Sequence, residues 1–203
     1  RPVPGFAELP CDLQQIREWA MDKRVVALMI MLAMHSAPTR AIDPLYHEVA
    51  DYVGVPVPIL YAMSQAESGL LTAGRFTPWP WTLNVAGEAQ RYEDRQSMFK
   101  GLMEALGTGE LMIDVGPMQV NWYWQFNAMG SPWRITDPAV NIKIAAEILK
   151  THYQRSGDWW EAVGRYHRPA DSPRDRQIAE KYRQRVRHFF EKTNTEEAKS
   201  DAA

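Results

Sequence analysis

From residue 42 onward, the sequence divides into helix-length segments bounded by proline, aspartate and glycine, and this pattern favours a mainly α-helical fold. In the clearest case, Asp137-Pro138 opens a segment as N-cap and first helical residue, positions that suit these residue types. The expected helices cover residues 42–53, 57–67, 92–106, 121–129, 139–154, 158–166 and 173–192. Residues 76–85 are instead rich in aromatic and β-branched side chains, which predicts a short strand or hairpin. Residues 193–203 are small, polar and charged, so we expect a disordered tail there.

The composition fits one globular domain and argues against several classes of function. Of 203 residues, 45% are hydrophobic, and the net charge of −2 gives no sign of a nucleic-acid partner. The single cysteine, Cys11, excludes an intrachain disulfide. The histidines have no metal-binding spacing, because Asp51 stands where an H-E-x-x-H motif beginning at His47 needs its second histidine. We therefore expect no metal and no cofactor.

Residues 21–41 have the layout of a secretory signal peptide. A short basic start at 21–24 precedes ten apolar residues at 25–34, and small residues follow up to Ala41. Ten apolar residues are too few to span a bilayer, which takes about 20. The alternative to a signal peptide is an apolar core helix. We expect Met21 to be the true start, residues 1–20 to be upstream sequence, and cleavage to follow Ala41. The mature protein is then periplasmic, with no stable membrane span.

Glu67 closes the apolar helical segment 57–67 and is followed at once by Ser68-Gly69. A glycine after a helix is a common stop, so Glu67 is expected in the last turn, where the helix dipole disfavours a carboxylate. Partial burial raises the pKa of a carboxyl group further, and a carboxyl protonated near neutral pH can act as a general acid. The alternative is a surface glutamate at a helix end.

Three later segments carry the next signal: Gly116-Pro117-Met118-Gln119, Tyr166-His167 and Tyr182. Each alone fits ordinary packing. In this order after Glu67-Ser68, they resemble the lytic transglycosylases of the SLT (soluble lytic transglycosylase) family, across about residues 46–190. That family has Glu-Ser at a helix end, then Gly-Leu-Met-Gln, Ala-Tyr-Asn and a late helical tyrosine. The resemblance implies a lysozyme-like, goose-type/SLT helical domain at residues 42–192.

Two features depart from the family pattern. His167 stands where the family usually has asparagine, and the insert between the first two motifs, residues 70–115, is longer than in compact members. We expect that insert to form a small β-hairpin or loop. The stretch at 78–84, with the segments around Asp114 and His167, also resembles a subgroup found with conjugative elements and type IV secretion or pilus systems.

The resemblance implies an enzyme that binds peptidoglycan glycan strands and cleaves the β-1,4 bond between N-acetylmuramic acid and N-acetylglucosamine. Glu67 protonates the leaving oxygen and then takes the proton of the muramoyl C6 hydroxyl, which closes a 1,6-anhydro ring. This route needs one catalytic carboxylate rather than the usual pair. The alternatives are a goose-type lysozyme-like hydrolase and a non-catalytic wall-binding or assembly protein.

Residues near Glu67 in these motifs, and aromatic residues of the insert, are the expected substrate contacts. Hydroxyl and amide side chains suit sugar hydroxyl and acetamido groups, and aromatic rings pack on the apolar faces of pyranoses. The expected contacts are Ser68, Met118, Gln119, Asn121, Tyr166, Tyr182, Trp79 and Trp81.

Some of these residues also fit purely structural roles. Asn121 is equally suited to cap the helix that follows it, and Trp79 and Trp81 fit core packing. Asp114 is read as a turn or N-cap aspartate. If Asp114 faced the scissile bond instead, hydrolysis would become the plausible reaction.

Overall fold

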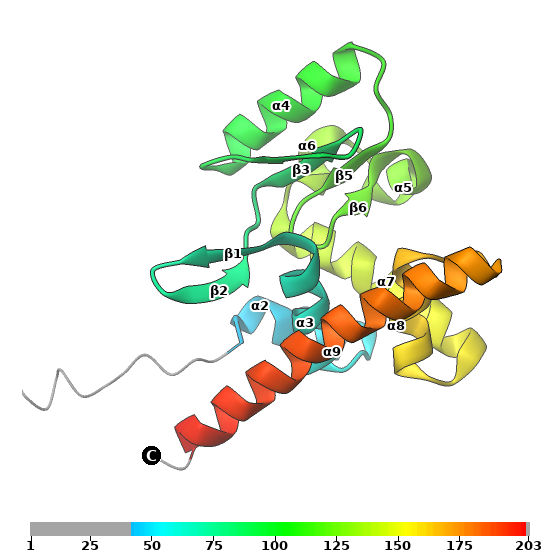
Figure 1. The fold of residues 1–203 in the computed structure, drawn as a ribbon. Helices are drawn as coiled ribbons and strands as arrows, with labels where there is room; N and C mark the ends of the chain where they lie inside the picture. The colour runs from blue at the N-terminus through cyan, green and yellow to red at the C-terminus, as the bar shows by residue number, and fades with distance from the viewer. Residues whose placement is uncertain (1–41, 202–203) are drawn as a thin grey trace, which may run out of the picture. The chain divides into compact units, whose positions relative to one another are not determined.

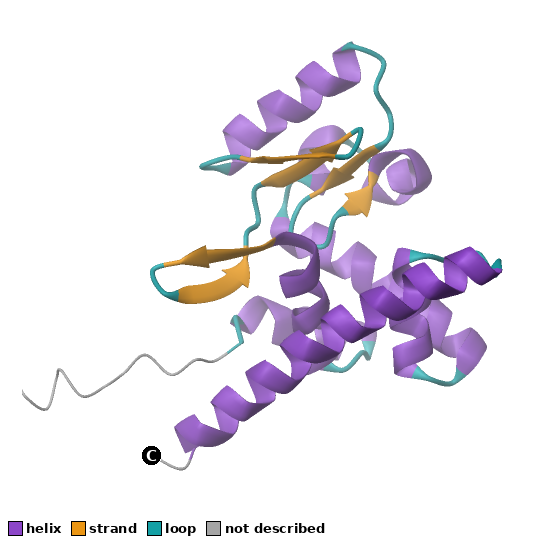
Figure 2. Cartoon of the chain, viewed as in Figure 1, coloured by secondary structure: helices purple, strands orange, loops and turns teal. Residues whose placement is uncertain are grey.

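The computed structural model describes residues 42–201, and these form a mainly helical domain with small antiparallel sheets (Figures 1 and 2). The proposed signal peptide, the upstream segment and Cys11 lie outside the described residues. The helices are α2 (Pro44–Val53), α3 (Val57–Ser68), α4 (Arg95–Gly107), α5 (Trp122–Met129), α6 (Pro132–Ile135), α7 (Pro138–Ser156), α8 (Trp159–His167) and α9 (Pro173–Asp201). The strands are β1 (Gly69–Thr72), β2 (Arg75–Pro78), β3 (Thr82–Val85), β4 (Glu88–Arg91), β5 (Ile113–Val115) and β6 (Val120–Asn121).

Side-chain caps fix the starts of several helices, as the sequence indicates. Asp137 accepts hydrogen bonds from the first-turn amides of α7, and Asp158 does the same for α8. Gly157 follows the last residue of α7, and its φ of 70° is the left-handed conformation that favours glycine. These caps confirm the mainly α-helical prediction and most of the expected helix boundaries. The short helix α6 was not expected.

The strands form more sheet than the sequence indicated. β1 and β2 make a hairpin, and a separate four-stranded antiparallel sheet has the order β4-β3-β5-β6. In its register, Asn84 pairs with Asp114, and Asp114 pairs with Asn121. Residues directly opposite on antiparallel strands share a face of the sheet. Three polar side chains from distant parts of the insert and the second motif therefore stand in one row.

α3 lies at the centre of the domain. Nine of its 12 residues are buried, including Leu60 and Met63, and α9 packs along it. Figure 1 shows α9 (orange to red) crossing both α3 and α8. Burial of nearly the whole helix holds its C-terminal turn rigidly, because native cores are close-packed.

The C-terminal segment corrects a prediction. α9 continues to Asp201, so the helix does not end at 192, and residues 193–201 are helical rather than a disordered tail. The segment has no glycine or proline to stop the helix. Thr193 is buried and donates a hydrogen bond to Gln65 at 3.2 Å, which ties this extension to α3. Across the described residues, none of the helices is both long and apolar enough to cross a membrane.

Candidate active site

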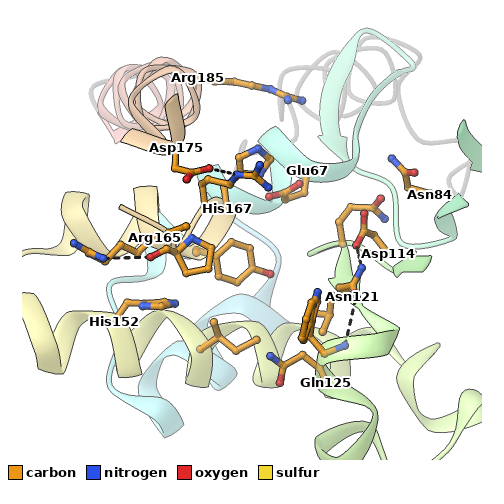
Figure 3. A pocket seen from close by; sticks show the side chains of 18 residues that line it. Glu67, Asn84, Asp114, Asn121, Gln125, His152, Arg165, His167, Asp175 and Arg185 are labelled. Atoms are coloured by element: carbon orange, nitrogen blue, oxygen red, sulfur yellow. Dashed lines mark hydrogen bonds and ion pairs between the residues drawn. The ribbon is translucent and has the colours of Figure 1, made fainter. Parts of the chain in front are cut away.

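Glu67 opens into a pocket of about 960 Å³ whose lining comes from α3, the four-stranded sheet, α5, α7, α8 and α9. Figure 3 shows two sides that face each other across Glu67. We call the side formed by Asn84, Asp114, Asn121, Trp124 and Gln125 the sheet wall. We call the side formed by Arg165, Tyr166, His167, Arg168 and Arg185 the helical wall.

Glu67 is the penultimate residue of α3, between the fully buried Ala66 and Ser68, and its own side chain is partly exposed. Burial raises the pKa of Glu67 from its ordinary 4.5 to about 7. Tyr182 and Arg185 oppose that increase, whereas the negative charge of Asp114 adds to it. Near neutral pH, Glu67 is therefore present in both protonation states, as a general acid and base requires.

Gly69 ends α3 for a different reason from the one expected. Its φ is −52°, so it is not a left-handed stop. A Cβ atom there would lie 2.2 Å from the Phe76 ring and 2.4 Å from the carbonyl oxygen of Gln65. The glycine allows β2 to approach the end of the helix closely.

Ser68 joins the end of α3 to the Gly116–Gln119 loop. Its hydroxyl donates to Pro117 O at 2.8 Å, with Ser64 O also within reach at 3.1 Å. The Ser64 hydroxyl reaches Pro117 O at 3.1 Å and lies 2.6 Å from Tyr46 Oη. Ser68 is fully buried and does not line the pocket, so it positions the loop against the residue next to it.

Asn141, which the sequence reading did not single out, holds the same loop from α7. Its Nδ2 donates to Val115 O at 2.7 Å, and its Oδ1 accepts from Met118 N at 3.0 Å. Gly116 has a φ of 77°, and a Cβ atom there would lie 2.7 Å from the Asn141 side chain. The loop therefore needs glycine at 116 for both conformation and space.

Met118, Gln119 and Tyr166 all come from the family motifs, but their surroundings differ. The Met118 side chain is fully buried in the core and lies outside the pocket lining. Gln119 lines the pocket with a φ of 48°, and its Nε2 donates to Gly116 O at 2.9 Å. Tyr166 lines the pocket and donates to Met118 O at 2.8 Å. Burial and the negative charges of Glu67 and Asp114 hold the Tyr166 pKa well above its ordinary value, so the hydroxyl remains a donor.

Asp114 lies in the middle of β5 and lines the pocket, so its interpretation as a turn or N-cap aspartate is wrong. Asn121 Nδ2 donates to Asp114 Oδ1 at 2.8 Å. Burial raises the pKa of Asp114, and this hydrogen bond partly offsets the increase. Asn121 also caps α5 by accepting from Trp124 N at 3.3 Å, and it lines the pocket. Asn121 therefore both caps the helix and lines the pocket.

Tyr182 and His167 form a stacked pair beside Glu67. Their ring centroids are 4.4 Å apart, with an interplanar angle of 7°. Tyr182 is buried, and its hydroxyl makes no hydrogen bond of normal geometry to another described residue. That hydroxyl still lies near enough to the Glu67 carboxyl group to lower its pKa. Partial burial lowers the pKa of His167, as do the charges of Arg185 and Arg168, and both influences favour the neutral imidazole.

The tryptophans of the insert do not line this pocket. Trp79 donates from Nε1 to Tyr92 O at 2.8 Å, and Trp81 packs against the core. Trp124 lines the pocket instead, and the sequence reading missed it. A usable signal was present, because Trp124 lies three residues after Asn121 and thus in the first turn of the next helix.

Comparison with known families agrees with the fold and the site. A family model described as the transglycosylase SLT domain matches residues 88–190, about half of the chain. The chain therefore belongs to the transglycosylase SLT family. Membership supports a lysozyme-like fold, a peptidoglycan substrate and lytic transglycosylase activity in general. No curated protein and no solved structure gives a significant match.

The matched segment contains Asp114, the 116–119 loop, Tyr166 and Tyr182 but begins after Glu67. The link from Glu67 to the family motifs is therefore geometric. It consists of the shared pocket and the hydrogen bond from Ser68 to Pro117.

Proposed function

We propose that the protein cleaves the β-1,4 bond between N-acetylmuramic acid and N-acetylglucosamine in peptidoglycan and leaves a 1,6-anhydro-N-acetylmuramic acid end. Glu67 serves as the single general acid and base. The observation that carries the proposal is that Glu67 lines the pocket and has a pKa of about 7. Burial keeps this carboxyl group protonated at pH values well above the ordinary pKa of a glutamate.

The reaction uses one carboxyl group twice. Protonated Glu67 donates its proton to the glycosidic oxygen, the bond from that oxygen to C1 breaks, and positive charge develops at C1. The Glu67 carboxylate then removes the proton of the C6 hydroxyl while O6 forms a bond to C1. The carboxyl group ends protonated, no water is consumed, and atoms and charge balance.

The surroundings of Glu67 suit both steps. Burial favours the protonated state that begins the reaction. Tyr182 and Arg185 lower the pKa and so favour the carboxylate that forms midway. These opposing influences keep the carboxyl group near the pH at which donation and removal of a proton are both accessible.

Mass spectrometry of digested peptidoglycan tests the proposal. The wild-type protein should release muropeptides with anhydro ends, and Glu67→Gln should release almost none while still binding the wall. Glu93→Gln, an exposed glutamate outside the pocket, is the matched control and should behave as wild type. Native-rate release by Glu67→Gln would contradict the assignment of the acid. Binding without any release by the wild type would favour the non-catalytic wall-binding alternative.

The position of Asp114 favours a second candidate, a lysozyme-like hydrolase. Asp114 lines the same pocket, and its charge acts on Glu67. A carboxylate so placed could hold a water molecule for attack at C1 and give a reducing end. The two products differ in mass by one water. Under our proposal, Asp114→Asn should still give products with anhydro ends, even where its rate differs; under the alternative, it should abolish reducing-end products.

We also propose that the protein works in the periplasm, alongside a conjugation, type IV secretion or pilus apparatus. The support is the signal-like layout of residues 21–41 and the resemblance to proteins of such systems. A reporter fused after Ala41 should be exported, and cytoplasmic retention would contradict the first part. Loss of the gene should lower transfer or secretion, with rescue by wild type but not by Glu67→Gln.

A further inference from the structure

Trp124 is an unusually exposed aromatic side chain for a residue that lines a pocket. Among the described residues, only Trp124 and Trp133 are tryptophans with largely exposed side chains, at 69% and 46%. Trp133 is partly covered, because the Arg95 guanidinium lies 4.2 Å above its ring and Phe99 packs against it in a T-shaped arrangement. Trp124 has no cation from the described part of the chain over its ring, is the more exposed of the two, and lies in the same pocket as Glu67.

The Trp124 ring is exposed but well supported. The Trp124 amide donates to Asn121 Oδ1, and the Asn121 side chain is in turn bonded to Asp114 in β5. The Tyr123 ring packs against Trp124 edge to face, with centroids 4.7 Å apart and an interplanar angle of 85°. A ring that is held in place while most of its surface stays exposed loses little freedom on binding a ligand, which favours affinity.

Polar groups flank the ring on the sheet wall. Gln125 follows it in the chain and lines the pocket, and its amide makes no hydrogen bond to any described residue. Figure 3 shows Gln125 on the same side of the pocket as Asn121. An open aromatic face beside a free amide matches a pyranose, which has an apolar face and an edge of hydroxyl and acetamido groups.

We propose that Trp124 and Gln125 form a saccharide-stacking subsite that binds a sugar of the glycan strand away from the bond being cleaved. This inference rests on the proposed function, because the ligand is the same glycan strand. Continuity with the Glu67 pocket is what selects a glycan over a protein partner as the occupant. Phe126, exposed on the same helix but outside the pocket lining, offers a matched comparison.

Binding of peptide-free glycan strands, sorted by length, tests the subsite. The measurement uses variants that also carry Glu67→Gln, so that the strands stay intact. Trp124→Ala should weaken binding of long strands by about fivefold to tenfold, the scale of one aromatic stacking contact. The weakening should decrease as the strands shorten. Trp124→Phe should stay within about twofold, since it keeps an aromatic face. Phe126→Ala should bind as the Glu67→Gln parent does.

The same variants with Glu67 intact separate this inference from the proposed function. Trp124→Ala should raise the KM for long strands and leave kcat unchanged. If wild type cleaves strands and Trp124→Ala matches Phe126→Ala in affinity and KM, the subsite is wrong while the proposed function stands. If wild type neither binds nor cleaves any strand, both fail. If Trp124→Ala instead dissolves a dimer in sedimentation without weakening glycan binding, the face is a protein interface and the subsite is wrong.

Discussion

The two walls of the pocket differ in chemistry, and Glu67 responds to both. The sheet wall carries one acid, amides and an exposed aromatic ring, whereas the helical wall carries three arginines and a histidine, with Asp175 paired to one of the arginines. Asp114 on the sheet wall raises the pKa of Glu67, and Arg185 on the helical wall lowers it. The sheet wall therefore favours the protonated form of Glu67, whereas the helical wall favours its carboxylate.

The walls are also held in different ways. Backbone register places the sheet wall, because Asn84, Asp114 and Asn121 occupy paired positions on three strands. Ion pairs order much of the helical wall, including Arg165 with Glu161 and Asp171 and Arg168 with Asp175. Exposed ion pairs are weak and weaken further in salt, so the sheet wall should be the more rigid of the two.

The largest expected effect comes from removing the residue on which both walls act. Glu67→Gln should lower turnover by about 10³-fold, within the range for loss of a general acid and base. The measurement is the rate of muropeptide release at saturating peptidoglycan. Circular dichroism should show an unchanged fold, since the substitution preserves shape. A loss of less than about tenfold would assign the proton transfer to another group.

The same variant should be more stable than wild type at high pH. The folded pKa of about 7 exceeds the ordinary 4.5, so folding is penalised once the unfolded chain has lost this proton. The contribution of protonated Glu67 to the free energy of unfolding is fully present below about pH 4.5 and is lost as the pH rises through about 7. Glu67→Gln should therefore raise the free energy of unfolding at pH 8 by up to about 3 kcal/mol, with little change at pH 4. Denaturant titration at both pH values measures the difference.

Loss of the Asn141 side chain that holds the Gly116–Gln119 loop should have the next largest effect on activity. Asn141→Ala removes a buried amide that bonds Val115 O and Met118 N, at the junction of the sheet wall and the motif loop. Leaving these backbone groups without partners should reduce stability by about 2–4 kcal/mol. Residual activity at a temperature where the variant is folded should fall by about 10²-fold, because misplacing a reacting group is costly. Native activity in a folded variant would show that the loop does not position the site.

The sequence predicted the helices better than it predicted the walls. Helix periodicity and caps such as Asp137 are local, so they can be read directly from the chain. The row of Asn84, Asp114 and Asn121 depends on pairing between strands about 30 residues apart, and three-residue β5 has too short a pattern to reveal it. The same limit led to Asp114 being read as a turn residue.

Among the site residues, motif spacing identified Glu67, Gln119, Asn121 and Tyr166, all of which line the pocket. It also selected Met118, whose side chain packs inside the core. Spacing tells which residues belong to the loop but does not tell which way a side chain of that loop points. For Trp79 and Trp81, residue type suggested a sugar contact, and tertiary packing placed both outside the pocket.

A charge change on each wall should move the pH profile in opposite directions. Activity should fall as pH rises through the Glu67 pKa, because the first step needs the protonated acid. Asp114→Asn removes a negative charge and lowers that pKa, so the rate at pH 8 should fall about threefold. Glu88→Gln, on β4 outside the pocket, is the control and should leave the profile unchanged. A profile that stays in place would mean that Asp114 does not act on Glu67 through its charge.

Arg185→Gln is the counterpart on the helical wall. Loss of its positive charge should raise the Glu67 pKa and extend activity to higher pH, with a rate increase at pH 8 of about twofold. Because Arg185 is exposed, salt screens its charge, so the shift should decrease as the ionic strength rises. Arg187→Gln tests specificity, since Arg187 lies over the Trp160 ring and outside the pocket. Parallel rather than opposite shifts for Asp114→Asn and Arg185→Gln would contradict the proposed division of roles between the walls.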